Sequence, residues 1–159
     1  MFSSLSKRSN VPGMRSGFVA GDAAILKKFL LYRTYHGCAM APPVQTASVA
    51  AWNDEAHVLD NRHQYREKFA ACTPLISEVL GTGMPDASFY LWAKTPIADT
   101  EFARGLLEHY NVVVLPGSFL AREIRGVNPG ANFIRIALVA SLAECLEATQ
   151  RIRQFAQQL

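Results

Sequence analysis

The sequence lacks the long apolar run that a membrane-spanning helix requires, because no stretch reaches about 18 consecutive apolar residues. It also lacks a block of like charges: only 18% of its 159 residues are charged, and the net charge of +3 is spread along the chain. This spread gives little support to nucleic-acid binding. The first seven residues are too short and too polar for a signal peptide. Internal repeats and low-complexity tracts are absent as well.

Cysteine is scarce, and its pattern predicts reduced structural thiols in a cytoplasmic protein. Cys38, Cys72 and Cys145 are odd in number and share no metal-type spacing. The four histidines also show no metal or catalytic-triad spacing, so no metal site is expected. Half of the residues are apolar, which is ordinary for a folded chain, and 159 residues can bury one core or form one small domain plus part of another.

The hydrophobic patterning predicts an α/β chain. From residue 87 onward, the expected order is strand, helix, strand, strand, helix, which describes a small α+β unit with helices on one side of a sheet. Asp22, Ser141 and either Asp99 or Thr100 are expected to cap helices, and Pro74 is expected to kink or divide the longest one. Strands are expected at 18–21, 87–93, 111–115 and 132–139, and helices at 23–36, 44–52, 55–80, 99–110 and from 141 onward.

The residues that carry chemistry are concentrated between Ser4 and Phe18. Lys7 lies among serines, and Arg15 follows eight positions later across Pro12-Gly13. Pro12 fixes its own φ and Gly13 permits a positive φ, so a sharp reversal is expected to bring Arg15 back toward Lys7. Two neighbouring cations need an anion, and a phosphate would accept hydrogen bonds from serine hydroxyls and a guanidinium. A lysine beside a cation also suits Schiff-base chemistry. A solvated surface loop is the alternative that this spacing leaves open.

This segment resembles the cofactor-attachment site of class I/II (fold type I) pyridoxal-phosphate-dependent aminotransferases, in which Ser-x-Ser-Lys is followed, eight residues after the lysine, by a phosphate-binding Arg. The residues from 4 to 22 are most similar to those of the succinyldiaminopimelate aminotransferases of lysine biosynthesis. The resemblance implies that Lys7 forms the Schiff base with pyridoxal 5′-phosphate. It also implies that Ser4, Ser6 and Arg15 help to bind this cofactor. Ser16 departs from the family pattern, which prefers an aliphatic residue or alanine there.

Arg135 is the second candidate, because it lies within the apolar strand predicted at 132–139. A charge among such neighbours needs an anionic partner or access to solvent. The residues alone leave open an internal salt bridge or a solvent-reaching side chain. The family pattern Phe-x-Arg-Ile implies instead that Arg135 binds the substrate α-carboxylate. Arg122 and Arg125 are weaker candidates for a second carboxylate, or are simply solvated.

The resemblance also implies how the chain is organised and what it does. Residues 1–55 would end the large cofactor-binding domain, 56–80 would form the long connecting helix, and 81–159 would form the small C-terminal domain of a homodimeric enzyme. The implied reaction transfers an amino group between an amino-dicarboxylate derivative and 2-oxoglutarate, with Lys7 as general base and acid. Two alternatives stay open: another fold type I enzyme such as a C–S lyase, or a small domain that is inactive by itself.

Overall fold

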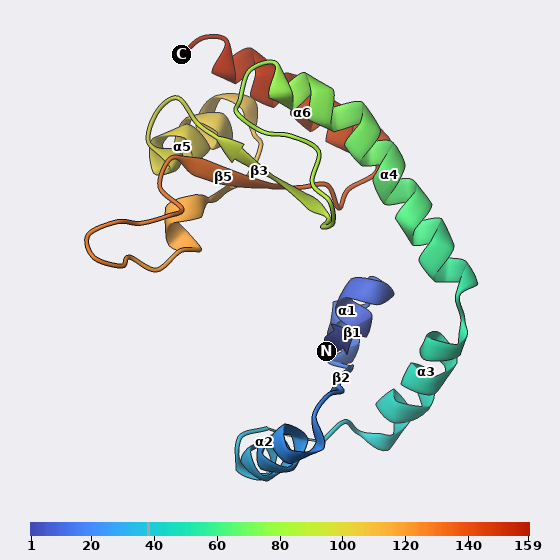
Figure 1. Cartoon of the computed structure of the whole chain (residues 1–159). Coiled ribbons are helices and arrows are strands. Elements are labelled where there is room, and N and C mark those ends of the chain that lie inside the picture. The colour runs from blue at the N-terminus through green and yellow to red at the C-terminus, as the bar shows by residue number, and fades with distance from the viewer. Residues whose placement is uncertain (38) are drawn as a thin grey trace. The chain divides into compact units, whose positions relative to one another are not determined.

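Figure 1 shows the computed structural model of the protein, which describes residues 1–37 and 39–159. Cys38, predicted to be a structural thiol, lies outside the described residues. The chain divides into two compact units, Met1–His63 and Gln64–Leu159. The predicted α/β class is confirmed. Within the described ranges, no helix has both the length and the apolar character needed to cross a membrane.

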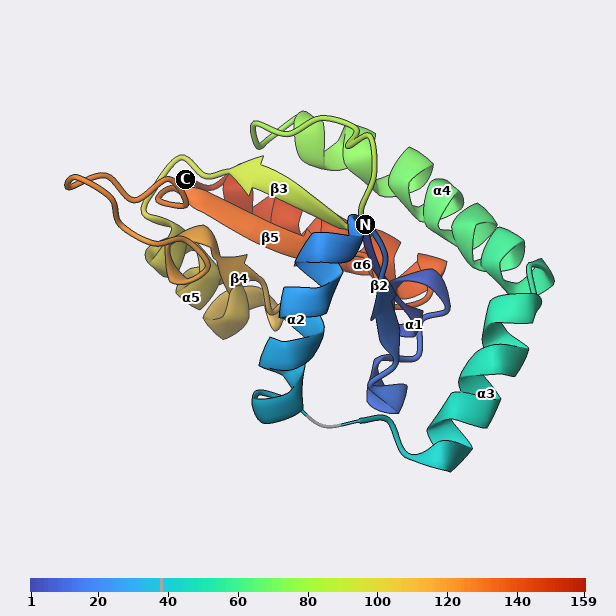
Figure 2. The ribbon, with the colours of Figure 1, turned by 60° about the horizontal axis from the view of Figure 1, so that its bottom comes forward.

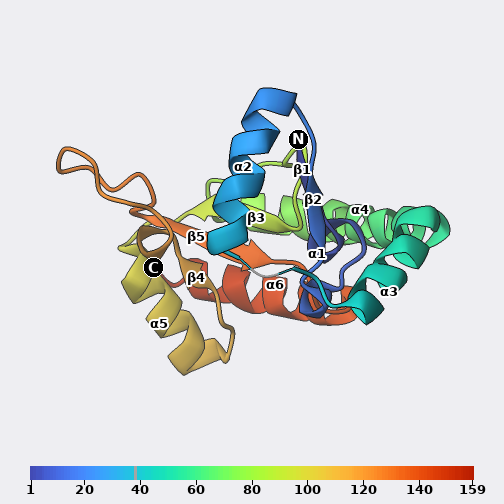
Figure 3. The ribbon, with the colours of Figure 1, turned by 90° about the horizontal axis from the view of Figure 1, so that it is seen from below.

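The first unit begins with a two-stranded antiparallel ladder that flanks a single helical turn (Figure 3). Its pairs run from Phe2 opposite Val19 to Ser4 opposite Gly17. The strand predicted at 18–21 is therefore confirmed, with its bounds shifted to 17–19. Its partner at residues 2–4 is not predicted from the sequence, because three residues are too few to show an alternating pattern. The elements of this unit are β1 (Phe2–Ser4), α1 (Leu5–Arg8), η1 (Pro12–Met14), β2 (Gly17–Val19), α2 (Ala23–Tyr35), α3 (Pro42–Asn53) and the start of α4 (Ala56–Ser77).

The helices begin largely where the sequence predicts. The Asp22 carboxylate accepts a hydrogen bond from the Ile25 N–H (3.0 Å), which confirms the cap of α2. α3 carries a proline in its first turn, as expected. Pro74 does not divide α4, which continues as one helix to Ser77. Because this proline lies in the last turn, its missing N–H costs only one bond near the helix end.

The second unit is built around a three-stranded antiparallel sheet in the order β3-β5-β4 (Figure 2). One face is buried under helices and contains the paired residues Leu91 and Ile136. The other face carries the cross-strand pair Trp92 and Arg135. The predicted alternation along residues 132–139 is thus confirmed. The elements are β3 (Tyr90–Lys94), α5 (Asp99–Tyr110), β4 (Leu115–Pro116), η2 (Gly117–Phe119), β5 (Phe133–Ala137) and α6 (Leu142–Ala156), together with the later part of α4.

The apolar run at 111–115 forms less strand than its composition predicts. Asn111 ends α5 in the left-handed conformation (φ 52°), and the Val112 N–H bonds back to the Leu106 carbonyl. The ladder with β5 therefore includes only Leu115 and Pro116. Val114 is buried whereas Val113 is 80% exposed, so burial accounts for only part of this apolar run.

Cys72 and Cys145 are free thiols buried in the core of the second unit. Burial raises the pKa of Cys145 above its ordinary value, and the neighbouring Cys72 raises it further. Its sulfur therefore stays protonated, consistent with the structural role that the sequence predicts.

Neither Asp99 nor Thr100, the two predicted candidates, caps α5, and Asp99 has a different role. The cap residue of α5 is Ala98, and Asp99 is the first residue of the helix. Its carboxylate accepts hydrogen bonds from the Ser118 N–H (2.8 Å), the Ser118 hydroxyl (2.6 Å) and the Asn132 N–H (3.2 Å). This one side chain therefore fixes both ends of the loop that leads into β5, and with it the start of the strand that carries Arg135.

We expect Asp99→Asn to destabilise the second unit by about 2 kcal/mol near neutral pH, because hydrogen bonds to a charged acceptor are lost. Burial alone would raise the pKa of Asp99, but the hydrogen bonds from Ser118 and Asn132 outweigh it and lower the pKa. A carboxyl whose pKa is lower in the folded chain stabilises the fold above its ordinary pKa, and this contribution is lost as the pH falls below about 4. Urea unfolding at several pH values from 7 to 3 measures the free energy of unfolding of both proteins. The wild type should be more stable than the variant at pH 7, and this difference should shrink as the pH falls toward 3. A constant difference across that range would contradict the assignment.

Candidate functional site

The turn predicted around Pro12-Gly13 is present as η1, and it ends at Arg15. The sequence predicts a left-handed residue at Gly13. The structure instead has this conformation at Arg15 (φ 51°, ψ 37°) and at Asn10. A side chain in this region costs about 1–2 kcal/mol. The Arg15 Nη1 donates to the Pro12 carbonyl (2.9 Å), which orients the guanidinium over the turn.

All four residues predicted to bind the cofactor line one pocket of about 450 Å³ in the first unit. Ser4 and Ser6 come from the junction of β1 and α1, Lys7 from α1, and Arg15 from the end of η1. Ser4 is the cap residue of α1, yet its hydroxyl makes no capping hydrogen bond. The described residues that line it are Ser4, Ser6, Lys7, Pro12, Arg15, Ser16 and Gly17.

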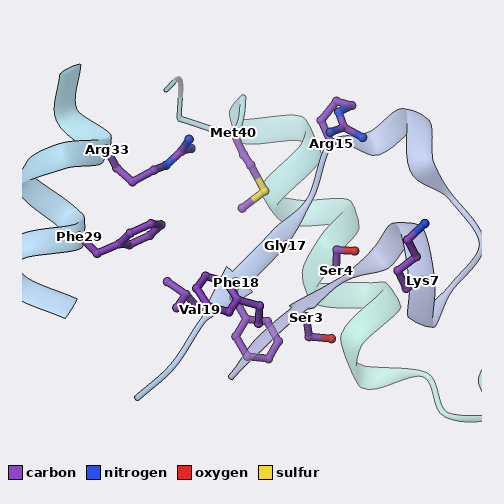
Figure 4. Close-up of a pocket in the computed structure, with 11 residues that line it drawn as sticks. Ser3, Ser4, Lys7, Arg15, Gly17, Phe18, Val19, Phe29, Arg33 and Met40 are labelled. Carbon is purple, nitrogen blue, oxygen red and sulfur yellow. The ribbon is translucent and has the colours of Figure 1, made fainter. Parts of the chain in front are cut away.

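A second pocket of about 680 Å³ adjoins the first and shares Ser4, Lys7, Arg15 and Gly17 with it. Figure 4 shows the Lys7 amine, the Ser4 hydroxyl and Arg15 toward one end of this pocket, with side chains of α2 at the other. Its lining also includes Phe2, Ser3, Phe18, Val19, Phe29, Arg33 and Met40. The contribution of α2 is not apparent from the sequence, since Phe29 and Arg33 look like ordinary helix residues.

The pocket walls are cationic and rich in hydroxyl groups. Lys7, Arg15 and Arg33 contribute positive charge, and the described residues that line the two pockets include no aspartate or glutamate. Arginine and serine donors around such a space fit a phosphate group, and a lysine amine beside it fits an aldehyde. The residues present therefore suit pyridoxal phosphate. The described residues contain no cluster of side chains suited to a metal ion.

Gly17 keeps the two strands close at the edge of the pocket. A Cβ atom at this position would lie 2.8 Å from the Ser3 carbonyl and 3.1 Å from the Ser4 Cβ. Ser16, which departs from the family pattern, points away from solvent, with its hydroxyl 2.7 Å from that of Ser48 in α3. A buried serine here is satisfied by a second hydroxyl rather than by apolar packing.

Arg135 lies in the second unit, half-buried on the open face of the sheet. Its guanidinium carbon is 5.2 Å from the centre of the Tyr90 ring. Among the described residues, the structure places no carboxylate within ion-pair distance of Arg135. Arg122 and Arg125 are exposed in the loop before β5. The predicted roles of Lys7 and Arg15 in cofactor binding and of Arg135 in substrate binding stay predictions.

The sequence model of the family described as aminotransferase class I and II matches residues 1–152. The chain belongs to this aminotransferase family. The family depends on pyridoxal 5′-phosphate, so the predicted cofactor is confirmed at the level of the family.

Three proteins illustrate the likeness. An aminotransferase from Neisseria meningitidis is 58% identical, with a TM-score of 0.88 over 97% of this chain and 39% of its own. A probable N-succinyldiaminopimelate aminotransferase from Thermus thermophilus is 33% identical, with a TM-score of 0.82 over 97% of this chain and 41% of its own. A probable aminotransferase of Mycobacterium tuberculosis is 34% identical over 94% of this chain and 34% of its own length. The chain thus spans between about a third and two fifths of these proteins.

Proposed function

We propose that this chain supplies the cofactor-attachment lysine and the substrate-carboxylate arginine of a pyridoxal-phosphate-dependent aminotransferase. The observation that carries the proposal is the shared pocket of Ser4, Ser6, Lys7 and Arg15. Those four side chains offer one amine, one guanidinium and two hydroxyls to a single space, and its described lining residues include no aspartate or glutamate.

Each residue has a distinct role in this proposal. Arg15 and the Ser4 and Ser6 hydroxyls would hold the cofactor phosphate and so place the cofactor beside Lys7. The Lys7 Nζ would be the point of attachment, and as a free amine it would act as general base and acid, moving a proton between the substrate α-carbon and the cofactor carbon. Arg135 grips the substrate α-carboxylate through two parallel hydrogen bonds and so orients the α-carbon. Pyridoxal phosphate, when bound, supplies the electron sink for this proton transfer.

The proposed substrate is an amino-dicarboxylate derivative, with N-succinyldiaminopimelate as the specific candidate and 2-oxoglutarate as the amino acceptor. Support comes from the residues between Ser4 and Asp22 and from the similarity to the probable N-succinyldiaminopimelate aminotransferase of T. thermophilus. Lysine biosynthesis, a cytoplasmic location and a homodimer follow from the same proposal. So does the division into the end of a cofactor domain (1–55), a connecting helix (56–80) and a small domain (81–159).

The test completes this chain with the portion of the N. meningitidis aminotransferase that it does not match; we call the resulting protein the completed enzyme. We expect it to transfer the amino group of N-succinyldiaminopimelate to 2-oxoglutarate. Transfer from other amino donors but not from this one would retain the reaction type and reject the substrate. Release of pyruvate from cystathionine, with no amino transfer from any donor, would instead identify a C–S lyase and contradict the proposal.

A further inference from the structure

Arg8, the residue after Lys7, makes an unusually dense set of contacts for a side chain on a four-residue helix. Its guanidinium donates to the carbonyls of Ala51 (2.6 Å), Trp52 (3.4 Å) and Asp54 (3.3 Å). It also pairs with the Glu55 carboxylate, and its central carbon lies 4.9 Å from the centre of the Trp52 ring. The Arg8 side chain is only 12% exposed. These partners all belong to the junction where α3 ends and α4 begins.

The next residue binds the same junction. The Ser9 hydroxyl lies 2.9 Å from the His57 Nε2, while the other ring nitrogen of His57 lies 2.9 Å from an Asp54 carboxylate oxygen. At the start of α1, Leu5 is fully buried, and its N–H bonds to the Ser16 carbonyl (3.1 Å). The turn that carries Lys7 is thus held by Leu5 at its start and by Arg8 and Ser9 at its end.

A single helical turn has no intrinsic stability in water, so its direction depends on such tertiary contacts. Lys7 itself is exposed and projects from this turn into the shared pocket. The direction in which its Cα–Cβ bond leaves the helix is set by the rotation of α1 about its axis. The Arg8 guanidinium contacts three carbonyls and one carboxylate at once, which restricts that rotation.

We propose that Arg8 is a positioning residue for Lys7: it locks α1 against the α3–α4 junction so that the lysine amine points into the pocket. His57 supports the same lock through Ser9. This inference rests on the proposed function, since it takes Lys7 as the reacting amine. It adds that the reactivity of Lys7 is controlled by residues more than forty positions away, at a junction that does not itself line the pocket.

The test measures the selectivity of labelling within one molecule. The whole chain is treated briefly with limiting pyridoxal phosphate, so that a lysine amine displaces the aldehyde oxygen as water. Borohydride then reduces the new carbon–nitrogen double bond by adding hydride to its carbon. Peptide mass spectrometry gives the ratio of label on Lys7 to label on Lys28, an exposed lysine of α2. We expect the wild type to favour Lys7 and Arg8→Met to lower the ratio about tenfold, because charge-assisted hydrogen bonds hold the turn.

Two further variants distinguish a loss of Lys7 orientation from a general destabilisation of the first unit. Arg8→Lys keeps the charge without the planar fork and should recover only part of the ratio. Asp22→Ala removes the cap of α2 in the same unit, yet should leave the ratio unchanged. An unchanged ratio in Arg8→Met would overturn the inference while leaving the proposed function intact, as would an equal fall in Asp22→Ala. No preference for Lys7 in the wild type would overturn both.

Discussion

Replacing Lys7 with alanine is expected to lower amino transfer by the completed enzyme about 10²- to 10⁴-fold, the range typical for loss of a general base or acid. The same change should remove the preferred borohydride-stable adduct from the chain. The physical reason is that Lys7 contributes the one lysine amine among the described residues of the shared pocket. Absorbance titration with pyridoxal phosphate, followed by dialysis, measures retention of the cofactor, and initial rates measure the transfer.

Lys28→Ala provides the matched control. Lys28 is an exposed lysine of the first unit and lines neither of the two adjoining pockets. We expect this variant to keep both the adduct and the rate. The thermal unfolding of Lys7→Ala should also stay close to that of the wild type, because the Lys7 side chain is exposed. Equal losses in the two variants would mean that the cofactor reacts with lysines indiscriminately.

Replacing Arg135 with lysine is expected to raise the KM for the amino donor about ten- to hundredfold. A bidentate carboxylate contact is then reduced to a single ammonium contact, and each hydrogen bond to a charged partner contributes about 1.5–3 kcal/mol. Steady-state kinetics of the completed enzyme measure the change. The folding of the second unit should be little affected, because the structure shows Arg135 against the Tyr90 ring rather than in an internal ion pair with a described carboxylate.

Arg104→Leu is the control for this prediction, because Arg104 is an exposed arginine of α5 in the same unit. It should leave the KM unchanged. Should Arg135→Lys unfold the second unit while leaving the KM of the surviving protein unaltered, Arg135 would be a structural residue and its proposed contact with the substrate would be wrong.

The cofactor motif was accessible from the sequence because it is local. Lys7 and Arg15 are eight positions apart, and a proline-containing turn between them suffices to place both on one pocket. The buried alternation around Arg135 was equally readable, since a strand shows its two faces directly in its sequence. What these stretches share is that a few neighbouring residues determine the geometry.

The parts that sequence reasoning missed depend on distant partners. Aspartate is a residue type that commonly caps helices, but the Asp99 carboxylate accepts hydrogen bonds from Ser118 and Asn132, which lie 19 and 33 positions away. Arg8 looks like a solvated neighbour of Lys7, yet its acceptors lie 43 to 47 positions downstream. Charge and spacing give no signal for contacts of this kind, because tertiary packing brings them together.

The most direct test of the cofactor pocket is the structure of the completed enzyme with pyridoxal phosphate bound. We predict that the phosphate is held by Arg15 and the Ser4 and Ser6 hydroxyls, and that the Lys7 nitrogen is bonded to the carbon of the former aldehyde group. A phosphate bound by other residues, with the Lys7 amine directed into bulk solvent, would contradict the account.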